Sequence, residues 1–193
     1  MKRFLSISLI FFLILACSAA LGVENTGNWQ ELNSRTTGFY KKQKFMKAAV
    51  AGREAVAAAR NLPEEERSSL AVSLGNLAMI YTHLGKFPDA EDLAKEELKL
   101  RQDISGKESP DVITAWNHLA IIYTMAGKLK KINPDAEQCL LQVVAISEKA
   151  FGKNSPKIIP ALKKIQKYYR ITGNTTKEKQ MTDRLAVLQP SAG

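Results

Sequence analysis

The sequence predicts an all-α protein built from about four similar helix pairs, stacked as a solenoid after an N-terminal signal segment. Three observations carry this prediction. The chain contains an internal repeat of 42 residues, apolar residues recur at spacings of three and four within each copy, and helix-breaking residues separate the apolar runs.

The repeat is clearest in the middle of the chain. The segment SLGNLAMIYTHLGKFPDAE is similar to AWNHLAIIYTMAGK, so that Leu74 aligns with Trp116 at a spacing of 42 residues. A weaker copy around Leu32 comes before this pair, and a fourth copy around Leu162 follows at a spacing of 46 residues. The four additional residues fall in LKKIN (129–133), because the segment PDAE reappears four places late.

Each copy contains two amphipathic helices. In the second copy Leu74, Leu77, Ala78 and Tyr81 share one helical face, as apolar residues three and four apart do. We therefore expect helices near residues 29–43, 45–60, 64–84, 87–104, 110–126, 134–151, 157–172 and 175–188.

Breakers and caps set the predicted ends of these helices. Gly85 and Gly127 are expected to end first helices. Residues 109–111 and 133–135 each supply an N-cap side chain, a proline at the first helical position and an early acid. A proline beyond the first turn removes a backbone hydrogen bond, so the seventh helix could also begin only at Pro160.

Residues 1–22 have the layout of an export signal: Lys2 and Arg3, then an apolar stretch, then small residues. Three fates remain open. Cleavage after Ala20 fits the small-residue rule, lipid attachment at Cys17 fits the similarity of ILAC to a bacterial lipobox, and the stretch is long enough for an uncleaved anchor. The protein is expected to be exported to the periplasm or secreted, with Cys17 as the candidate for lipid anchoring to the envelope.

The residues after the signal, 23–193, carry an uneven charge. The formal net charge of +9 falls to +7 if Lys2 and Arg3 are removed. Residues 23–127 contain 13 basic and 14 acidic side chains, whereas residues 128–193 contain 13 basic and 5 acidic ones. Cys139 is the only cysteine after Cys17, which excludes an internal disulfide framework and predicts a buried thiol within a helix pair.

Small residues at Ala78 and Ala120 allow two helices to approach closely, and Tyr81 and Tyr123 fill the space beside them. This pattern resembles tetratricopeptide repeats. The 42-residue spacing, LGNLAMIYTHLGKFPDAE and the downstream Ser-Pro-Asp resemble the kinesin-light-chain type.

The resemblance covers repeats near 29–60, 64–104, 110–151 and 157–188. The sequence departs from the repeat pattern at Thr36 and Gln166, which replace the alanine, and at the insertion in the third copy. The resemblance implies a right-handed superhelix whose first helices line a concave groove for extended peptides or partner helices.

In this repeat alignment, the residues one position after the core residues of each first helix form a stripe along that helix. We expect this stripe to face the groove. Gly75 and Thr82 belong to that stripe, and an asparagine at the place of Asn76 contacts the peptide in the kinesin-light-chain type. The candidate groove residues are Asn76, Met79, His83, Asn117, His118, Ile121, Lys163, Lys167 and Arg170. The last three form a cationic stripe that either binds a carboxylate or phosphate of a partner or is a solvated basic face.

The sequence favours a non-catalytic scaffold that binds a protein or peptide in the bacterial cell envelope. Neither His83 nor His118 has the neighbours that a zinc site or a nucleophile–base pair requires, and we find no phosphate-cradling glycine loop or serine elbow. We therefore expect no cofactor, metal, catalytic residue or small-molecule substrate. The alternatives are a membrane-tethered assembly subunit that acts through self-association and, disfavoured by export, nucleic-acid binding through the basic C-terminal third.

Overall fold

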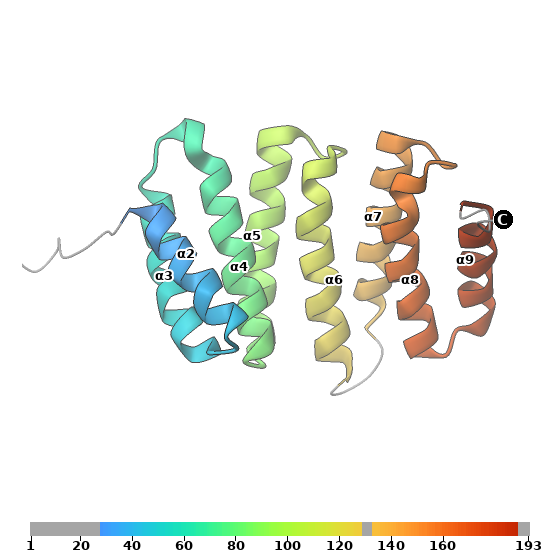
Figure 1. Cartoon of the computed structure of the whole chain (residues 1–193), viewed down its shortest axis with the longest axis horizontal. Coiled ribbons are helices and arrows are strands. Elements are labelled where there is room, and N and C mark those ends of the chain that lie inside the picture. Colours follow the sequence, from blue (N-terminus) through green and yellow to red (C-terminus); the bar gives the residue numbers. More distant parts are fainter. Residues whose placement is uncertain (1–27, 129–132, 189–193) are drawn as a thin grey trace, which may run out of the picture.

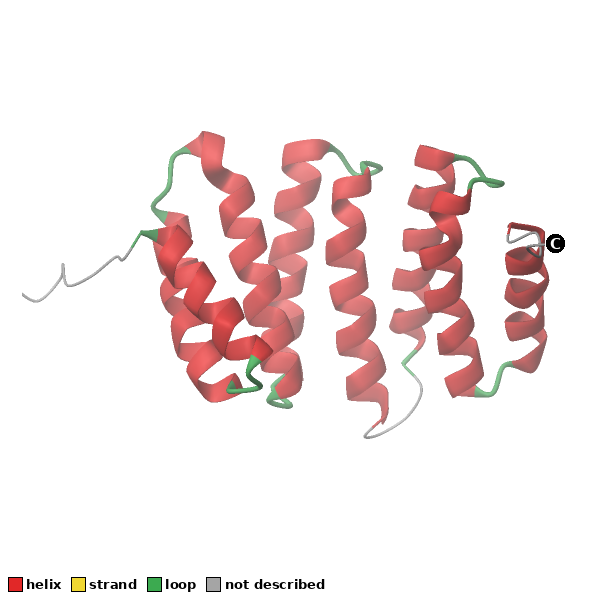
Figure 2. Cartoon of the chain, viewed as in Figure 1, coloured by secondary structure: helices red, strands yellow, loops and turns green. Residues whose placement is uncertain are grey.

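The computed structural model describes residues 28–128 and 133–188. The predicted export signal, its cleavage site, Cys17 and the insertion at 129–132 lie outside these residues. The described part forms eight α-helices and no strand (Figures 1 and 2). The helices are α2 (Trp29–Lys41), α3 (Phe45–Arg60), α4 (Arg67–His83), α5 (Phe87–Ser105), α6 (Ile113–Lys128), α7 (Pro134–Phe151), α8 (Ile159–Thr172) and α9 (Thr175–Leu188).

The helices form four antiparallel pairs that stand side by side in one row. α2 packs on α3, α4 on α5, α6 on α7 and α8 on α9, and each pair also packs on the next. Figure 1 shows the row running from α2 and α3 at one end to α8 and α9 at the other. The predicted all-α repeat fold is therefore confirmed. The first helices of the pairs, α2, α4, α6 and α8, line one face.

The helix ends differ from the prediction in small ways. The predicted helices at 64, 110 and 157 each open with a 3-10 turn before the α-helix, and the seventh becomes α-helical at Ile159. The predicted caps are present: the side chains of Ser109 and Asn133 accept hydrogen bonds from the backbone N–H groups of Asp111 and Asp135. The prediction that Gly127 ends its helix is wrong, because α6 continues through it to Lys128.

Small side chains lie where the helices approach most closely. Ala48, Ala78, Ala90 and Ala136 are fully buried. Thr36 takes the place of the alanine in the first copy and is also buried, at 1% exposure. Its hydroxyl donates to the Leu32 carbonyl oxygen in the same helix, so this departure from the repeat pattern leaves the packing intact.

The thiol of Cys139 lies in the core of the second half of the solenoid, as predicted. Burial raises its pKa to about 12, which keeps it in the unreactive thiol form. A search of the described helices for one with the length and apolar character needed to span a bilayer found none.

Candidate functional site

The first helices of neighbouring repeats are joined by polar side chains along the face that they line. Asn76 of α4 donates a hydrogen bond from Nδ2 to Oδ1 of Asn33 in α2 over 2.9 Å. Lys164 of α8 donates from Nζ to Oδ1 of Asn117 in α6, also over 2.9 Å. In the repeat alignment Asn33 and Asn117 occupy one position, and Asn76 and Lys164 occupy the next one. The same two positions of the repeat are thus hydrogen-bonded to each other at the α2–α4 junction and at the α6–α8 junction.

The α4–α6 junction uses a different arrangement, centred on Glu97 of α5. The Glu97 side chain is completely buried, and its two oxygens accept from Nε of Arg101 at 2.8 Å and from Nδ1 of His118 at 2.7 Å. Gly75 makes room for it, because a Cβ atom on this residue would lie 2.7 Å from Oε2 of Glu97. A buried carboxylate is tolerated only when it is paired and hydrogen-bonded, and both conditions are met here.

Glu97 was missed in the sequence analysis, although a signal for it exists. It aligns with Ala55 in the first repeat and with Val143 in the third, both of which are buried core residues. An acid at a core position, together with Gly75 inside a helix, predicts a compensating pair of residues. The expectation that Gly75 and Thr82 face the groove is wrong: Glu97 covers Gly75, and Thr82 is buried with its hydroxyl bonded to the Ala78 carbonyl oxygen.

A first hollow of about 310 Å³ lies on the face lined by α2, α4 and α6. Four of the predicted groove residues line it: Asn76, Met79, His118 and Ile121. His118 is held through Nδ1 by Glu97, which fixes the orientation of its ring at the edge of this hollow. His83 does not line it. Its ring stacks on Phe45, with ring centres 4.6 Å apart, and its Nε2 lies 2.9 Å from the Tyr40 hydroxyl.

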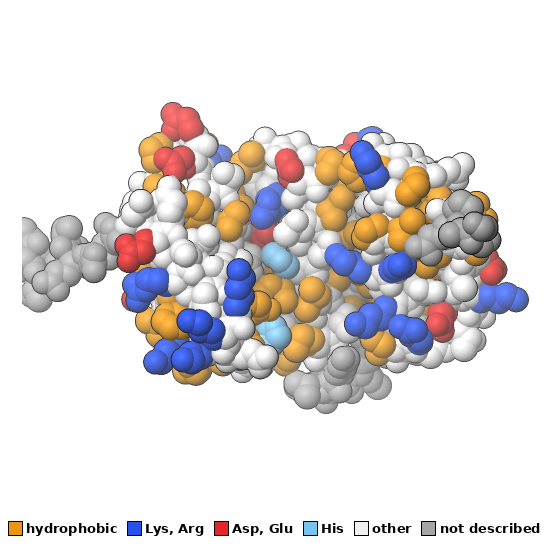
Figure 3. Space-filling view, viewed as in Figure 1, with side chains coloured by type: hydrophobic (Ala, Val, Ile, Leu, Met, Phe, Trp, Pro, Cys, Tyr) orange, Lys and Arg blue, Asp and Glu red, His pale blue; other side chains and the backbone are white. Residues whose placement is uncertain are grey.

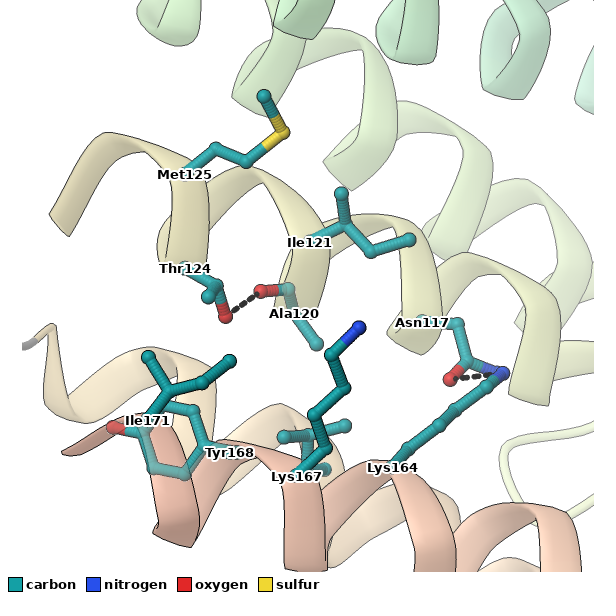
Figure 4. A pocket seen from close by; sticks show the side chains of 10 residues that line it. Asn117, Ala120, Ile121, Thr124, Met125, Lys164, Lys167, Tyr168 and Ile171 are labelled. Carbon is teal, nitrogen blue, oxygen red and sulfur yellow. Dashed lines mark hydrogen bonds between the residues drawn. The ribbon is translucent and has the colours of Figure 1, made fainter. Parts of the chain in front are cut away.

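A second hollow of about 260 Å³ lies between α6, α7 and α8, and Ile121 borders both hollows. Its wall is mostly apolar, as Figure 4 shows, with two ammonium groups beside it. The lining residues are Asn117, Ala120, Ile121, Thr124, Met125, Leu140, Lys164, Lys167, Tyr168 and Ile171. Lys167 extends over the hollow toward Ile121, whereas Lys164 turns to Asn117. Partial burial lowers the pKa of Lys164.

The cations of α8 divide into two sets. Lys164 and Lys167 border the second hollow, whereas Lys163 and Arg170 are exposed and line neither hollow. Lys163 and Arg170 align with Gly75 and Thr82, positions that are covered in the middle of the solenoid. Within residues 28–128 and 133–188 none of these four cations forms an ion pair. Figure 3 shows Lys and Arg side chains gathered over this end of the face, beside hydrophobic ones.

A second contact recurs at both of the later junctions. The hydroxyl of Tyr123 in α6 donates to Glu91 in α5, and the hydroxyl of Tyr169 in α8 donates to Glu137 in α7, each over 3.0 Å. Burial and the neighbouring carboxylate raise the pKa of both tyrosines, so both hydroxyls stay protonated and able to donate. These Tyr–Glu pairs join the second repeat to the third, and the third to the fourth, in the same way.

The described residues contain no cluster of three or more His, Cys, Asp or Glu side chains that could hold a metal ion. The geometry defines a class of protein: a helical repeat solenoid with a partly apolar, partly cationic surface along its first helices. Such solenoids present side chains of successive repeats to a partner.

Comparison with known proteins names the family. Two models described as tetratricopeptide repeats match the sequence, at residues 69–132 and 112–157. The chain thus contains tetratricopeptide repeats, and its fold is similar to that of kinesin-light-chain-like repeat proteins. Repeats of this family are generally sites of protein–protein interaction, and proteins that carry them are typically non-catalytic scaffolds. No match was found among the curated proteins.

Solved structures with the same fold include BtubC (BKLC) from P. vanneervenii, at 21% identity and a TM-score of 0.68; the match covers 85% of this chain and 63% of that protein. The putative kinesin light chain of Podosopora anserina, with nearly identical TPR-like repeats, is 19% identical with a TM-score of 0.71, covering 89% and 79%. A second crystal structure, of a substituted form of the Podosopora protein, is 18% identical at the same TM-score, covering 90% and 81%. At these sequence identities, the structural similarity shows a shared fold only.

Proposed function

We propose that the chain is a non-catalytic scaffold that binds a protein segment along the face formed by α2, α4, α6 and α8. The observation that carries this proposal is the pair of hollows that meet at Ile121 on the first helices of successive repeats. Ile121 is 40% exposed although it is a large apolar residue. A partner that covers it would gain the free energy of removing that apolar surface from water.

The chemistry of the second hollow indicates which partner residues fit there. An apolar side chain of the partner would fill the space beside Ile121 and Ile171, and an acidic residue would meet Lys167. Because Lys167 has no intramolecular ion pair within the described residues, a partner carboxylate would not have to displace one. We therefore expect an extended or helical segment that combines apolar and acidic residues.

We further propose that the protein acts in the bacterial cell envelope. The support is the sequence of residues 1–22, with its basic start, apolar stretch and small residues. Mass spectrometry of the mature N-terminus tests this directly. A chain that begins at Leu21 indicates ordinary cleavage, and a chain that begins at a lipid-modified Cys17 indicates anchoring. An intact chain from Met1 that is recovered from the cytoplasmic fraction alone contradicts the proposal.

Binding can be tested without knowing the natural partner. Peptides would be selected from a random display library on the purified protein, and their affinities measured by fluorescence anisotropy. Ile121→Asn is expected to weaken binding by about tenfold or more, since it removes an apolar contact of roughly 1.5 kcal/mol. The matched control is Leu141→Asn, because Leu141 on α7 is 42% exposed and lines neither hollow.

The charge of the partner is tested in the same assay. Lys167→Glu is expected to weaken binding of the selected acidic peptides, and Lys163→Glu, which lies outside the hollow, is expected to weaken it less. Equal loss in Ile121→Asn and Leu141→Asn would contradict binding in the groove. Equal loss in the two lysine variants would show that only overall charge matters.

A further inference from the structure

A second basic surface lies at the turn between α2 and α3, at the end of the row opposite α8 and α9 (Figure 1). We call it the α2–α3 corner, and it consists of Lys41, Lys42, Lys44, Met46, Lys47 and Val50. All six residues are exposed, Met46 to 69% and Val50 to 48%. The sequence has no acidic residue between Glu31 and Glu54. None of the four lysines forms an ion pair within the described part of the chain.

The start of α3, at two residues of the α2–α3 corner, departs from the repeat pattern in a direction that costs stability. Met46 and Lys47 align with Pro-Asp pairs at the starts of α5 and α7. Proline and an early acid both favour a helix start, whereas a cation there opposes the helix dipole. α3 has no acid in its first turn and no side-chain cap. Residues that break a local rule without local compensation are candidates for a function.

The shape of the α2–α3 corner favours one class of partner. Its residues lie at an outer turn, and neither of the two hollows includes them, so the corner does not enclose a peptide. The neighbouring ring of Phe45 is stacked on His83, with an interplanar angle of 3°, and this face is not free to stack on a nucleic-acid base. Exposed apolar side chains among lysines instead suit a flat, anionic surface with an apolar layer beneath it.

We propose that the α2–α3 corner docks on the surface of an anionic lipid bilayer. The four ammonium groups contact lipid phosphates, and Met46 and Val50 enter the boundary between headgroups and acyl chains. A single acyl chain gives only marginal membrane binding, so a second signal is needed for stable attachment. Cys17, the predicted lipid-attachment residue, precedes Lys41 by only 24 residues in the chain.

The test is cosedimentation of the purified full chain with vesicles of phosphatidylcholine alone or mixed with phosphatidylglycerol. The test variant carries Lys41→Gln, Lys42→Gln, Lys44→Gln and Lys47→Gln. The control variant removes the same number of cations from α8, as Lys163→Gln, Lys164→Gln, Lys167→Gln and Arg170→Gln. Both variants keep residues 1–27, so any membrane contact of those residues is common to them. Circular dichroism checks that each variant is folded.

The parent protein is expected to bind vesicles with phosphatidylglycerol and to be released by salt. Each cation near an anionic surface strengthens partitioning by about fivefold, so loss of all four should weaken partitioning of the test variant by about 600-fold, and the control variant should lose less than about fivefold. Met46→Ser should weaken partitioning several-fold, and Leu141→Ser should leave it unchanged. Equal losses in the two quadruple variants, no preference for phosphatidylglycerol, or lysine-dependent binding to duplex DNA without binding to vesicles would each overturn the proposal.

Discussion

The α4–α6 and α6–α8 junctions are built from the same repeat, but a buried carboxylate closes the contact between the helices at the first, whereas the second hollow opens between the helices at the second. Both carry the same Tyr–Glu pair, Tyr123 with Glu91 and Tyr169 with Glu137. They differ at three aligned positions on and beneath the groove face. Gly75, Glu97 and His118 form the buried contact at the closed junction, and Asn117, Val143 and Lys164 take their places at the hollow one.

This difference shows how a repeat solenoid can combine rigidity with a binding surface. A carboxylate fills the space over Gly75 and bonds to His118, so it closes this contact between α4 and α6 beside the first hollow, which His118 borders. At the next junction a single exposed hydrogen bond between Lys164 and Asn117 spans the helices, and apolar residues beside it remain open to solvent. The buried contact at one junction and the candidate binding site at the next thus differ at these three aligned positions.

The largest expected effect is that of Gly75→Ala at the closed junction. The added Cβ would lie within 2.8 Å of all three carboxylate atoms of Glu97, which is held by Arg101 and His118. Alanine is the better helix former by about 1 kcal/mol. We nevertheless expect a net loss of about 2–4 kcal/mol in the free energy of unfolding, measured by urea denaturation.

Two variants sharpen this prediction. Asn117→Ala, at the aligned position of the hollow junction, should cost less than about 1 kcal/mol because Asn117 is half-exposed. The double variant Gly75→Ala with Glu97→Val should recover part of the stability, since valine is the residue found at position 143. Additive losses in the double variant would contradict the steric explanation.

The second effect concerns the residue that bonds across each junction. His118→Ala leaves Glu97 with Arg101 as its one remaining partner in the described structure, and an under-satisfied buried carboxylate costs about 1–3 kcal/mol. Lys164→Ala, at the aligned position, loses an exposed hydrogen bond and should cost at most about 0.5 kcal/mol. Thermal unfolding of the two variants measures this difference, and equal costs would show that the buried carboxylate does not distinguish the junctions.

The smallest effect concerns the contact that both junctions share. Glu137 accepts hydrogen bonds from Lys177 and Tyr169, and the Lys177 bond is the main cause that lowers its pKa. A lowered pKa in the folded state stabilises the protein above the ordinary pKa of glutamate, and that stability is lost as the pH falls through the folded value. Glu137→Gln should therefore cost about 0.5–1 kcal/mol near neutral pH. In acid unfolding, the stabilities of variant and parent should converge, and a constant difference would contradict the assignment.

The sequence was enough to predict the solenoid because each helix pair carries its own pattern. The 42-residue spacing, the buried alanines and the caps at Ser109 and Asn133 are local features, and they predicted all eight described helices to within a few residues. The end of α6 was misplaced because Gly127, unlike Gly85 with its φ of +72°, keeps a helical conformation. A glycine permits a turn but does not require one.

The groove was harder to predict, because it depends on contacts between repeats. Of the residues that the repeat alignment assigned to the groove, Asn76, Met79, His118 and Ile121 line one hollow. Gly75 and Thr82, which were assigned to the same stripe, are covered by other residues. At the other hollow the sequence identified Asn117, Ile121 and Lys167, but Lys164 was not among the candidate residues. Which side of a helix its neighbours cover depends on the angle between the repeats, and that angle arises from side-chain packing rather than from the spacing of apolar residues.

The central claim is that a partner binds over the hollows along the first helices, including the one between α6 and α8, and leaves the buried Glu97 contact of the α4–α6 junction unchanged. Hydrogen exchange with and without a peptide selected from the display library tests it most directly. We predict slower exchange in α6 and α8, around Ile121 and Lys167, with the amides near Gly75 and Glu97 unaffected. Protection confined to the outer helices α5 and α7, or no protection in α8, would contradict the account.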